Sequence, residues 1–189
     1  MKNKFNKNSV MHLSSGKLFN LYDLNIDEID IEDIIHSLAK TCRYGGHVKR
    51  GLFYSVAEHS CLVTSIIEFN HADNYQREAL FHDVAETYVQ DIIKPLQVCY
   101  SEYEEFHQRV HEKIAEKFNI PKILSPEVQE ADEIAYWIEK RDILECETSV
   151  SDLAKIPKHL EHLSVCGFNW KSAAKTYRRY LDHYHFNQT

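Results

Sequence analysis

Glycine and proline are scarce in this chain of 189 residues, which contains five Gly and four Pro. Because tight turns depend on these residues, their scarcity argues against a many-stranded β architecture and favours helices joined by short loops. Long apolar runs are also missing: none approaches the ~18 residues of a transmembrane helix, and the first lysines are not followed by an apolar segment. We therefore expect a soluble chain that does not enter a membrane.

Positive charge is in short supply as well, since 22 Lys and Arg face 29 Asp and Glu, giving a net charge of −7. We expect no stable binding of nucleic acid, which normally requires clustered basic residues, although a local basic site could still take a small anion. The cysteines form no Cys-x-x-Cys motif, and their odd number leaves one unpaired in any disulfide scheme. We therefore expect reduced thiols in a cytoplasmic setting for all five cysteines: Cys42, Cys61, Cys99, Cys146 and Cys166.

The length predicts one domain, since a domain typically has about 100–200 residues, and 43% of this chain is hydrophobic. Residues 9–23 resemble two short strands around a glycine turn, and residues 1–8 are expected to be disordered. Residues 31–186 show the apolar spacing of helices. The predicted fold is an all-α, single-domain bundle of six or seven helices with a small N-terminal β-hairpin.

Capping signals mark several helix starts. Ser55 and Glu58 have the spacing of a capping box, and Ser125 followed by Pro126 has the pattern of a helix N-terminus. Asn169 similarly precedes the last predicted helix. The first expected helix begins at residue 31 and ends before Gly45. The others cover about residues 55–68, 75–89, 101–118, 126–145 and 170–185, and Pro95 lies in the loop after the helix over 75–89.

A histidine and an aspartate stand side by side in an apolar, helix-forming stretch: His82 and Asp83 in Ala-Leu-Phe-His-Asp-Val-Ala-Glu. An unpaired imidazole or carboxylate costs several kcal/mol when buried, so something must compensate this pair. At about 100° per residue, Glu86 falls angularly between the two and one turn beyond them. Three polar groups are therefore expected on one face of the predicted helix.

Helical spacing also turns two distant polar residues inward. His59 lies in line with Val56, Val63 and Ile66, and Asp132 lies in line with Val128, Ala135 and Tyr136. A single buried histidine is more often satisfied by a backbone carbonyl than by a metal. Two imidazoles and two carboxylates together, however, are a ligand set that suits one divalent ion of Mn, Fe, Co, Ni or Zn.

These residues stand in the order found in the HD-domain phosphohydrolases, a superfamily named for its His-Asp doublet. The chain resembles that superfamily, and within it the small single-domain 5′-deoxynucleotidases and the phage-type deoxynucleoside triphosphate triphosphohydrolases. The resemblance implies a helical bundle in which His59, His82, Asp83 and Asp132 coordinate one divalent metal. It is carried by Cys-Arg-Tyr (42–44), Ser-Val-Ala-Glu-His-Ser (55–60), Phe-His-Asp-Val-Ala-Glu (81–86), Asp91 with Pro95 after it, and Ala-Asp (131–132).

The same resemblance implies roles for further residues. Arg43 would contact the substrate phosphate, Glu86 would manage protons beside Asp83 in the catalytic centre, and Asp91 would lie near the sugar. Lys94 departs from the nucleotidase pattern and could hold extra phosphates. The plainer alternatives are a surface position for Arg43, a partner of a ligating histidine for Glu86 and a turn former for Asp91. His47 is a substrate-side candidate because it follows Arg43 closely in the sequence.

The implied activity is metal-dependent hydrolysis of 2′-deoxynucleoside 5′-monophosphates by a homodimer. A triphosphohydrolase that releases triphosphate is the first alternative, a nucleotide- or metal-binding HD module without turnover is the second, and phosphodiester cleavage is a remote third. His107 and His111 are spaced to share a metal, but no third ligand is obvious, so we interpret them as solvated histidines.

Overall fold

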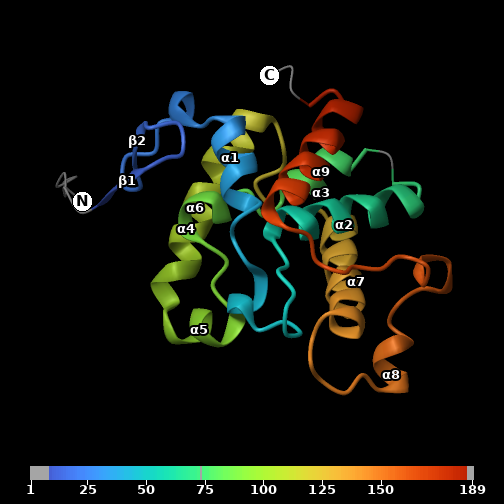
Figure 1. Cartoon of the computed structure of the whole chain (residues 1–189). Coiled ribbons are helices and arrows are strands. Elements are labelled where there is room, and N and C mark those ends of the chain that lie inside the picture. Colours follow the sequence, from blue (N-terminus) through green and yellow to red (C-terminus); the bar gives the residue numbers. More distant parts are fainter. Residues whose placement is uncertain (1–8, 73, 187–189) are drawn as a thin grey trace.

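The computed structural model describes residues 9–72 and 74–186, and these form a mostly helical structure with a small hairpin at one side (Figure 1). The predicted all-α fold class with an N-terminal hairpin is therefore confirmed. The disorder expected for residues 1–8 falls outside the described residues.

The hairpin pairs β1 (Val10–His12) with β2 (Leu18–Asn20) in antiparallel register, and Met11 lies opposite Phe19. Phe19 is buried and stacks on Tyr88, with 4.2 Å between the ring centroids. The turn of the hairpin is tied to the first α-helix because the Ser14 and Ser15 hydroxyls donate to the Asp33 carboxylate over 2.6 and 2.7 Å.

Helices make up most of the rest of the chain. The α-helices are α1 (Ile31–Leu38), α2 (Val56–Phe69), α3 (Gln76–Phe81), α4 (Glu86–Val89), α5 (Lys94–Cys99), α6 (Ser101–Phe118), α7 (Pro126–Asp142), α8 (Val150–Leu153) and α9 (Trp170–His183). Short 3₁₀ turns lie at η2 (Ile26–Glu28), η3 (Arg43–Gly46) and η4 (Lys158–Leu160).

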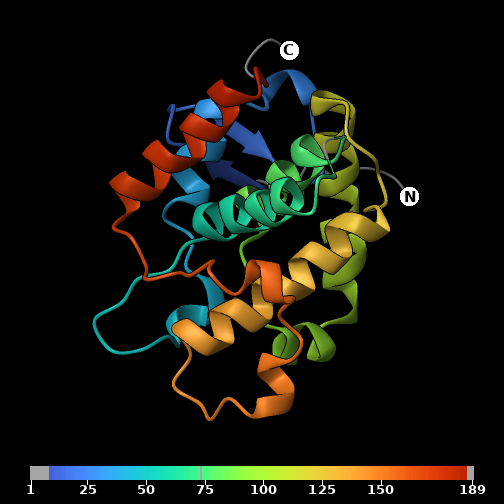
Figure 2. The ribbon, with the colours of Figure 1, turned by 90° about the vertical axis from the view of Figure 1, so that its right-hand side faces the viewer.

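Helix α2 is the centre of the fold and lies between α9 and α7 (Figure 2). Its residues Val56, Ala57 and Cys61 belong to a core shared with α1 and α9, whereas Val63 and Ile66 belong to a second core shared with α7. A helix that buries apolar residues on several sides is an internal helix. Polar residues near its start are therefore enclosed by protein.

The start of α2 confirms the predicted capping box. The Ser55 hydroxyl accepts the Glu58 backbone N–H over 3.2 Å, and the Glu58 carboxylate accepts the Ser55 backbone N–H over 3.1 Å. The second oxygen of Glu58 accepts the backbone N–H of Phe168 over 2.8 Å, which ties the segment before α9 to α2. The helix start is thus fixed both locally and by a distant segment.

The single helix predicted for residues 75–89 is wrong, because α3 ends at Phe81 and α4 starts at Glu86. Between them the backbone bonds span three residues, as from the Val84 N–H to the Phe81 carbonyl (3.1 Å) and from the Glu86 N–H to the Asp83 carbonyl (3.0 Å). These are 3₁₀-type bonds, which tighten the chain. The apolar pattern runs on through the break because the turn itself is buried.

Other boundaries also differ from the sequence-based expectation. A short helix, α5, replaces the loop expected around Pro95, which sits in its first turn, where proline is tolerated. Ser125 does not cap α7, because its hydroxyl donates to Glu78 instead. Helices α7 and α9 end at Asp142 and His183, so residues 31–186 are helical only in part.

Two expectations from composition can also be compared with the structure. All five cysteines are free thiols. Within residues 9–72 and 74–186, no helix has the length and apolar character needed to cross a membrane.

Candidate metal centre

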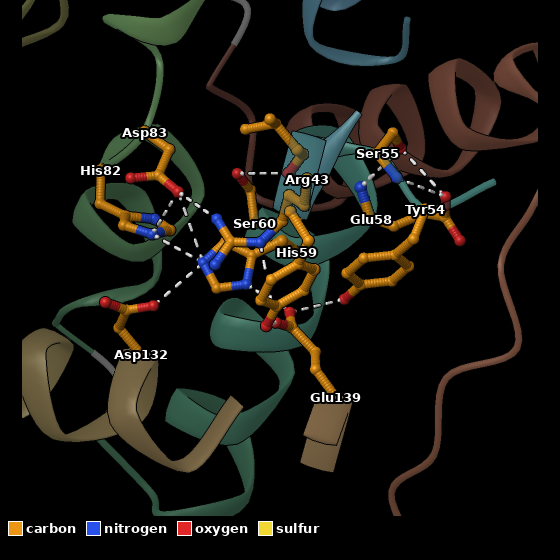
Figure 3. Close-up of polar contacts among 12 residues, drawn as sticks. Arg43, Tyr54, Ser55, Glu58, His59, Ser60, His82, Asp83, Asp132 and Glu139 are labelled. Atoms are coloured by element: carbon orange, nitrogen blue, oxygen red, sulfur yellow. Dashed lines mark hydrogen bonds and ion pairs between the residues drawn. The ribbon is translucent and has the colours of Figure 1, made fainter. Parts of the chain in front are cut away.

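Three segments bring four predicted ligands together (Figure 3). His59 comes from the first turns of α2, His82 and Asp83 from the turn after α3, and Asp132 from α7. The two histidine Nε2 atoms lie 3.2 Å apart, and His59 Nε2 lies 3.0 Å from Asp132 Oδ1. Asp83 Oδ2 lies 3.2 Å from His82 Nε2 and 3.4 Å from His59 Nε2.

The other nitrogen of each imidazole is occupied. His82 Nδ1 lies 2.7 Å from the Ala79 carbonyl, and His59 Nδ1 lies 2.6 Å from Glu139 Oε1. Because a carbonyl oxygen can only accept, His82 Nδ1 carries the proton, and in the neutral ring Nε2 presents a bare lone pair. The same holds for a neutral His59 beside the Glu139 carboxylate, so two nitrogen lone pairs and the Asp132 carboxylate form one candidate metal group, and Asp83 contacts both imidazoles.

This donor set fits a divalent transition metal. Metal–nitrogen and metal–oxygen bonds of about 2.0–2.2 Å place neighbouring ligand atoms roughly 3 Å apart around one ion, close to the separations of 3.0–3.4 Å found here. Acceptors that converge in this way repel one another unless a cation, either a proton on an imidazole or a metal ion, lies between them. The mixture of imidazole nitrogen and carboxylate oxygen suits the middle of the first transition series.

The electrostatics of the cluster also favour a cation. Burial and the Arg43 charge act to lower the pKa of His59, but Glu139 and Asp132 outweigh them and raise it to about 9. Burial acts to raise the pKa of Asp132, yet its hydrogen bond and charge interaction with His59 bring it down to about 2. A field that attracts a proton to an imidazole also attracts a metal ion, and the two compete for the same lone pair.

The His-Asp doublet lies at the break between α3 and α4. In this 3₁₀-type turn the His82 imidazole and the Asp83 carboxylate lie within 3.2 Å of each other. The two adjacent residues therefore present a nitrogen and an oxygen side by side.

The cluster is closed on one side and open on the other. The side chain of His59 is fully buried, whereas that of Asp132 is 45% exposed. The expectation that Asp132 points into the core is therefore only partly right, because its carboxylate lies at the rim. The cluster is therefore more exposed to solvent on the Asp132 side.

Arg43, the predicted phosphate-binding residue, lies beside Asp83 at the edge of the cluster. Its Nη1 donates to Asp83 Oδ2 over 3.2 Å, and its Nε lies 3.7 Å from Glu139 Oε2. Burial acts to lower the pKa of the guanidinium, but Glu139, Asp83 and Glu86 raise it well above the usual value. Arg43 therefore stays charged, directly beside the candidate ligands.

Glu86 is buried at the start of α4, and its Oε2 finds no hydrogen-bond partner among the described residues. Burial raises its pKa well above the ordinary range, and the charges of Asp83 and Asp91 add to that effect. A raised pKa favours the protonated carboxyl, the form that can serve as an acid. The role expected of Glu86 in proton transfer stays a prediction.

Of the remaining predicted substrate residues, Asp91 interacts with the charges of the cluster, whereas His47 and Lys94 are exposed. Asp91 is half-buried, and its pKa is raised by burial and by Asp83 while Arg43 opposes the rise, which places it within the field of the cluster. His47 is exposed and lines a neighbouring cavity of ≈ 1010 Å³ together with Tyr44. Lys94 is exposed, and within the described residues its ammonium group has no hydrogen-bond or ion-pair partner.

Sequence reasoning missed Glu139, a carboxylate that is completely buried behind His59 (Figure 3). It accepts hydrogen bonds from the hydroxyls of Tyr54, over 2.9 Å, and Tyr44. A signal was present, because Glu139 lies seven residues after Asp132 and so on the same side of α7. It was hidden by the charged run Lys140, Arg141 and Asp142, which has the composition of a solvated helix end.

Tyr44 has a backbone conformation that bulky residues rarely adopt, with φ 58° and ψ 23°. The left-handed region costs a residue of this kind about 1–3 kcal/mol and persists only where surrounding contacts enforce it. The contacts here include the hydrogen bond from the Tyr44 hydroxyl to Glu139 and that from the Arg43 backbone N–H to the Tyr54 carbonyl. The segment that carries Arg43 is thus held in a strained turn.

The paired histidines of α6 differ from the solvated pair that we expected. His111 is buried, and its Nε2 lies 3.4 Å from the Pro121 carbonyl. Burial also lowers the pKa of both His107 and His111. Among the described residues the candidate metal cluster is formed by His59, His82 and Asp132, with Asp83 in contact, and does not include this pair.

Comparison with known proteins agrees with this geometry. A family model described as an HD domain matches residues 35–189. The chain belongs to the HD-domain family. HD domains form a superfamily of metal-dependent phosphohydrolases that bind divalent metals, so hydrolase chemistry and metal binding follow at that level.

Two bacterial relatives of this HD domain are themselves described as uncharacterized. YfdR of Escherichia coli (strain K12) is 37% identical over 135 residues, which cover 71% of this chain and 72% of YfdR. A protein of Rhodobacter capsulatus is 30% identical over 139 residues, which cover 71% of each chain. These likenesses extend over most of the HD domain.

Proposed function

We propose that this HD domain is a 5′-deoxynucleotidase that hydrolyses 2′-deoxynucleoside 5′-monophosphates to deoxynucleoside and phosphate. The observation that supports the proposal is the cluster of His59, His82 and Asp132, with Asp83 in contact with both imidazoles and the Arg43 guanidinium bonded to Asp83 at its edge. A cation site and a phosphate-binding group would then lie side by side. Phosphoester hydrolysis requires both.

His59, His82, Asp83 and Asp132 would hold one divalent ion of Mn, Fe, Co, Ni or Zn. Such an ion, when bound, supplies Lewis acidity toward a phosphoryl oxygen and lowers the pKa of water toward ~7. The side chains are held ready for this role, because His59 and His82 are oriented through their Nδ1 atoms by Glu139 and the Ala79 carbonyl. Fixed imidazoles of this kind bind metal with less loss of entropy.

Arg43 would bind the phosphoryl oxygens. Its guanidinium is planar and permanently charged and can make two parallel hydrogen bonds to a phosphate. In the structure it is bonded to Asp83 Oδ2, so it already faces the centre on which the ligands converge. Charge that develops on the phosphoryl group is thereby neutralised.

Glu86 would act as the proton donor. In the reaction the water oxygen bonds to phosphorus and the water releases a proton to solvent, while the bond from phosphorus to the sugar O5′ breaks and O5′ takes up a proton from Glu86. Burial raises the pKa of the Glu86 carboxyl, which favours the protonated form that this step needs, and its Oε2 has no partner among the described residues. General acid catalysis of this kind contributes about 10²- to 10⁴-fold. We assign Asp91, which lies within the field of the cluster, to the sugar.

A deoxynucleoside triphosphate triphosphohydrolase is the second candidate. The cavity of ≈ 1010 Å³ that Tyr44 helps to line also has two cationic side chains, Lys49 and Arg50, together with Glu145. Lys49 and Arg50 would offer positive charge for further phosphates beyond the first. The product separates the two activities, because one releases phosphate and the other triphosphate.

The test is an assay of the protein loaded with Mn²⁺ or Co²⁺ against all deoxy- and ribonucleoside mono- and triphosphates. We expect phosphate release from deoxynucleoside monophosphates, and loss of both metal binding and hydrolysis in Asp83→Ala but not in Asp27→Ala, whose side chain is exposed on η2. Full turnover by Asp83→Ala would refute the metal mechanism. Inertness on the whole panel with metal bound would favour a binding module without turnover.

We also propose that the enzyme is a cytoplasmic homodimer, as its free thiols and the resemblance to small nucleotidases suggest. Size-exclusion chromatography coupled to light scattering measures the molar mass of the protein directly. A monomer mass at micromolar concentration would exclude the dimer and leave the proposed reaction unaffected.

A further inference from the structure

We propose that Glu139 is a positioning residue that holds the metal ligand His59 with one carboxylate oxygen and the phosphate-binding segment around Arg43 with the other. The part of this proposal that concerns substrate rests on the proposed function. The part that concerns metal does not.

Oxygen Oε1 of Glu139 faces the metal side. It lies 2.6 Å from His59 Nδ1 and accepts the Tyr54 hydroxyl over 2.9 Å. A carboxylate on the far nitrogen of a ligating histidine fixes the ring and makes Nε2 a better donor to metal. Tyr54 is buried in the segment just before α2, so the carboxylate oxygen is itself held in place.

Oxygen Oε2 of Glu139 faces the substrate side. It accepts the hydroxyl of Tyr44, and it lies 3.7 Å from Arg43 Nε. Tyr44 sits at φ 58°, a conformation that needs an external contact to persist, and the Arg43 N–H is bonded to the Tyr54 carbonyl over 3.0 Å. Glu139 thus holds the side chain of Tyr44, and the hydrogen bond to the Tyr54 carbonyl holds the backbone at Arg43.

The charge of Glu139 matters as well as its shape. A carboxylate that is completely buried is stable only when donors or positive charge compensate it. Here two tyrosine hydroxyls and one imidazole contact it, and the Arg43 guanidinium lies 3.7 Å away as an ion pair without a hydrogen bond from Nε. Glutamine has the same shape but no charge, and its amide nitrogen donates where Oε2 of Glu139 accepts. The substitution Glu139→Gln therefore removes the negative charge beside His59 and Arg43 and reverses the hydrogen bond to the Tyr44 hydroxyl.

The experiment compares Glu139→Gln with Glu78→Gln, a matched control. Glu78 is also buried and also accepts hydrogen bonds from its surroundings, but its partner is Ser125 at the start of α7, away from the cluster. Cobalt affinity is measured by calorimetry and by the visible absorption of the bound ion. Inorganic phosphate affinity is measured on the cobalt-loaded protein.

We expect Glu139→Gln to weaken cobalt binding roughly 10- to 100-fold, the range found when the outer partner of a metal ligand is removed, and to shift the cobalt spectrum. Its phosphate affinity, measured at saturating cobalt, should fall as well. Glu78→Gln should lower thermal stability and leave both affinities unchanged. Wild-type cobalt affinity in Glu139→Gln, or an equal loss in Glu78→Gln, would overturn the proposal.

Tyr44→Phe tests the substrate side separately and does not depend on Glu139→Gln being folded. It removes one hydroxyl on Oε2, so phosphate should bind about 2- to 10-fold more weakly, the effect of one hydrogen bond, with cobalt affinity unchanged. Unaltered phosphate affinity would overturn the substrate half. If the wild type hydrolyses no nucleotide but Glu139→Gln still loses cobalt, the proposed function fails and the metal half of the inference stands.

Discussion

The hydroxyl of Tyr177 in α9 donates a hydrogen bond to the backbone carbonyl of Leu80, 2.8 Å away in the last turn of α3. This carbonyl lies two residues before His82 and belongs to the end of a helix, where carbonyl groups lack intrahelical partners. Tyr177 is completely buried. The C-terminal helix therefore supports the turn that presents the His-Asp doublet.

Replacing Tyr177 by Phe should lower the free energy of unfolding by about 1–3 kcal/mol, because the Leu80 carbonyl is left buried without its donor. Urea denaturation measures this change. Tyr100→Phe is the control, since Tyr100 is 63% exposed. Equal stability of the two variants would show that another group satisfies the carbonyl.

Removal of divalent metal should destabilise the protein. An ion that binds only the folded state adds about 2.7 kcal/mol at a concentration one hundred times its dissociation constant. We expect a chelator to lower the melting temperature and added Mn²⁺ or Co²⁺ to restore it. In Asp132→Asn, which keeps the shape of the ligand but loses its charge, the response to metal should shrink. A melting temperature that changes neither with chelator nor with added metal would contradict the metal site.

Alanine at Gly167 should be markedly destabilising. Gly167 has φ +74°, and an added Cβ would lie 2.6 Å from the Phe53 carbonyl oxygen. Gly16→Ala is the matched control, because its φ is +83° but nothing lies within 4 Å of the new atom. The control should lose only the ~1–2 kcal/mol of left-handed strain, and Gly167→Ala more than that. Similar losses in thermal or urea unfolding would mean that the Phe53 segment moves aside.

The contact between α7 and the start of α8 should weaken in acid. The backbone N–H of Ser149 and the Lys140 ammonium, which lies 2.9 Å from Asp152, lower the pKa of Asp152 to about 2. Because the folded pKa is below the unfolded value of ~3.9, this stabilisation is present above about pH 4 and is lost as the pH falls toward 2. The stability difference between wild type and Asp152→Asn, measured in urea at each pH, should therefore shrink below pH 4. A constant difference would argue against the carboxylate's role.

Much of the fold and of the candidate metal centre could be predicted from the sequence where apolar helical periodicity and helix-capping residues coincide. His59 was recognised because it shares a stripe with apolar residues, and Ser55 and Glu58 form their capping box as expected. The hairpin was found from its glycine turn. Such features depend on residues that are close in sequence, so local patterns suffice to find them.

The rest depends on contacts between distant segments. The break after Phe81 escaped notice because the buried turn keeps the apolar pattern of a helix. Tyr44 and Tyr54 lie in a loop without periodicity, and only the approach of α7 reveals that their hydroxyls share Glu139. No rule of spacing connects residues 85 and 95 positions apart in the chain.

Asp132 and Glu139 project from the same helix, two turns apart, with continuous α-helix between them. A tilt of α7 therefore displaces a carboxylate of the cluster and the anchor of the Tyr44 turn in a single motion. Escape of a bound ion and loosening of that turn are accordingly expected to share one rate constant. Opening of this enzyme would then be an all-or-none event governed by the docking of one helix.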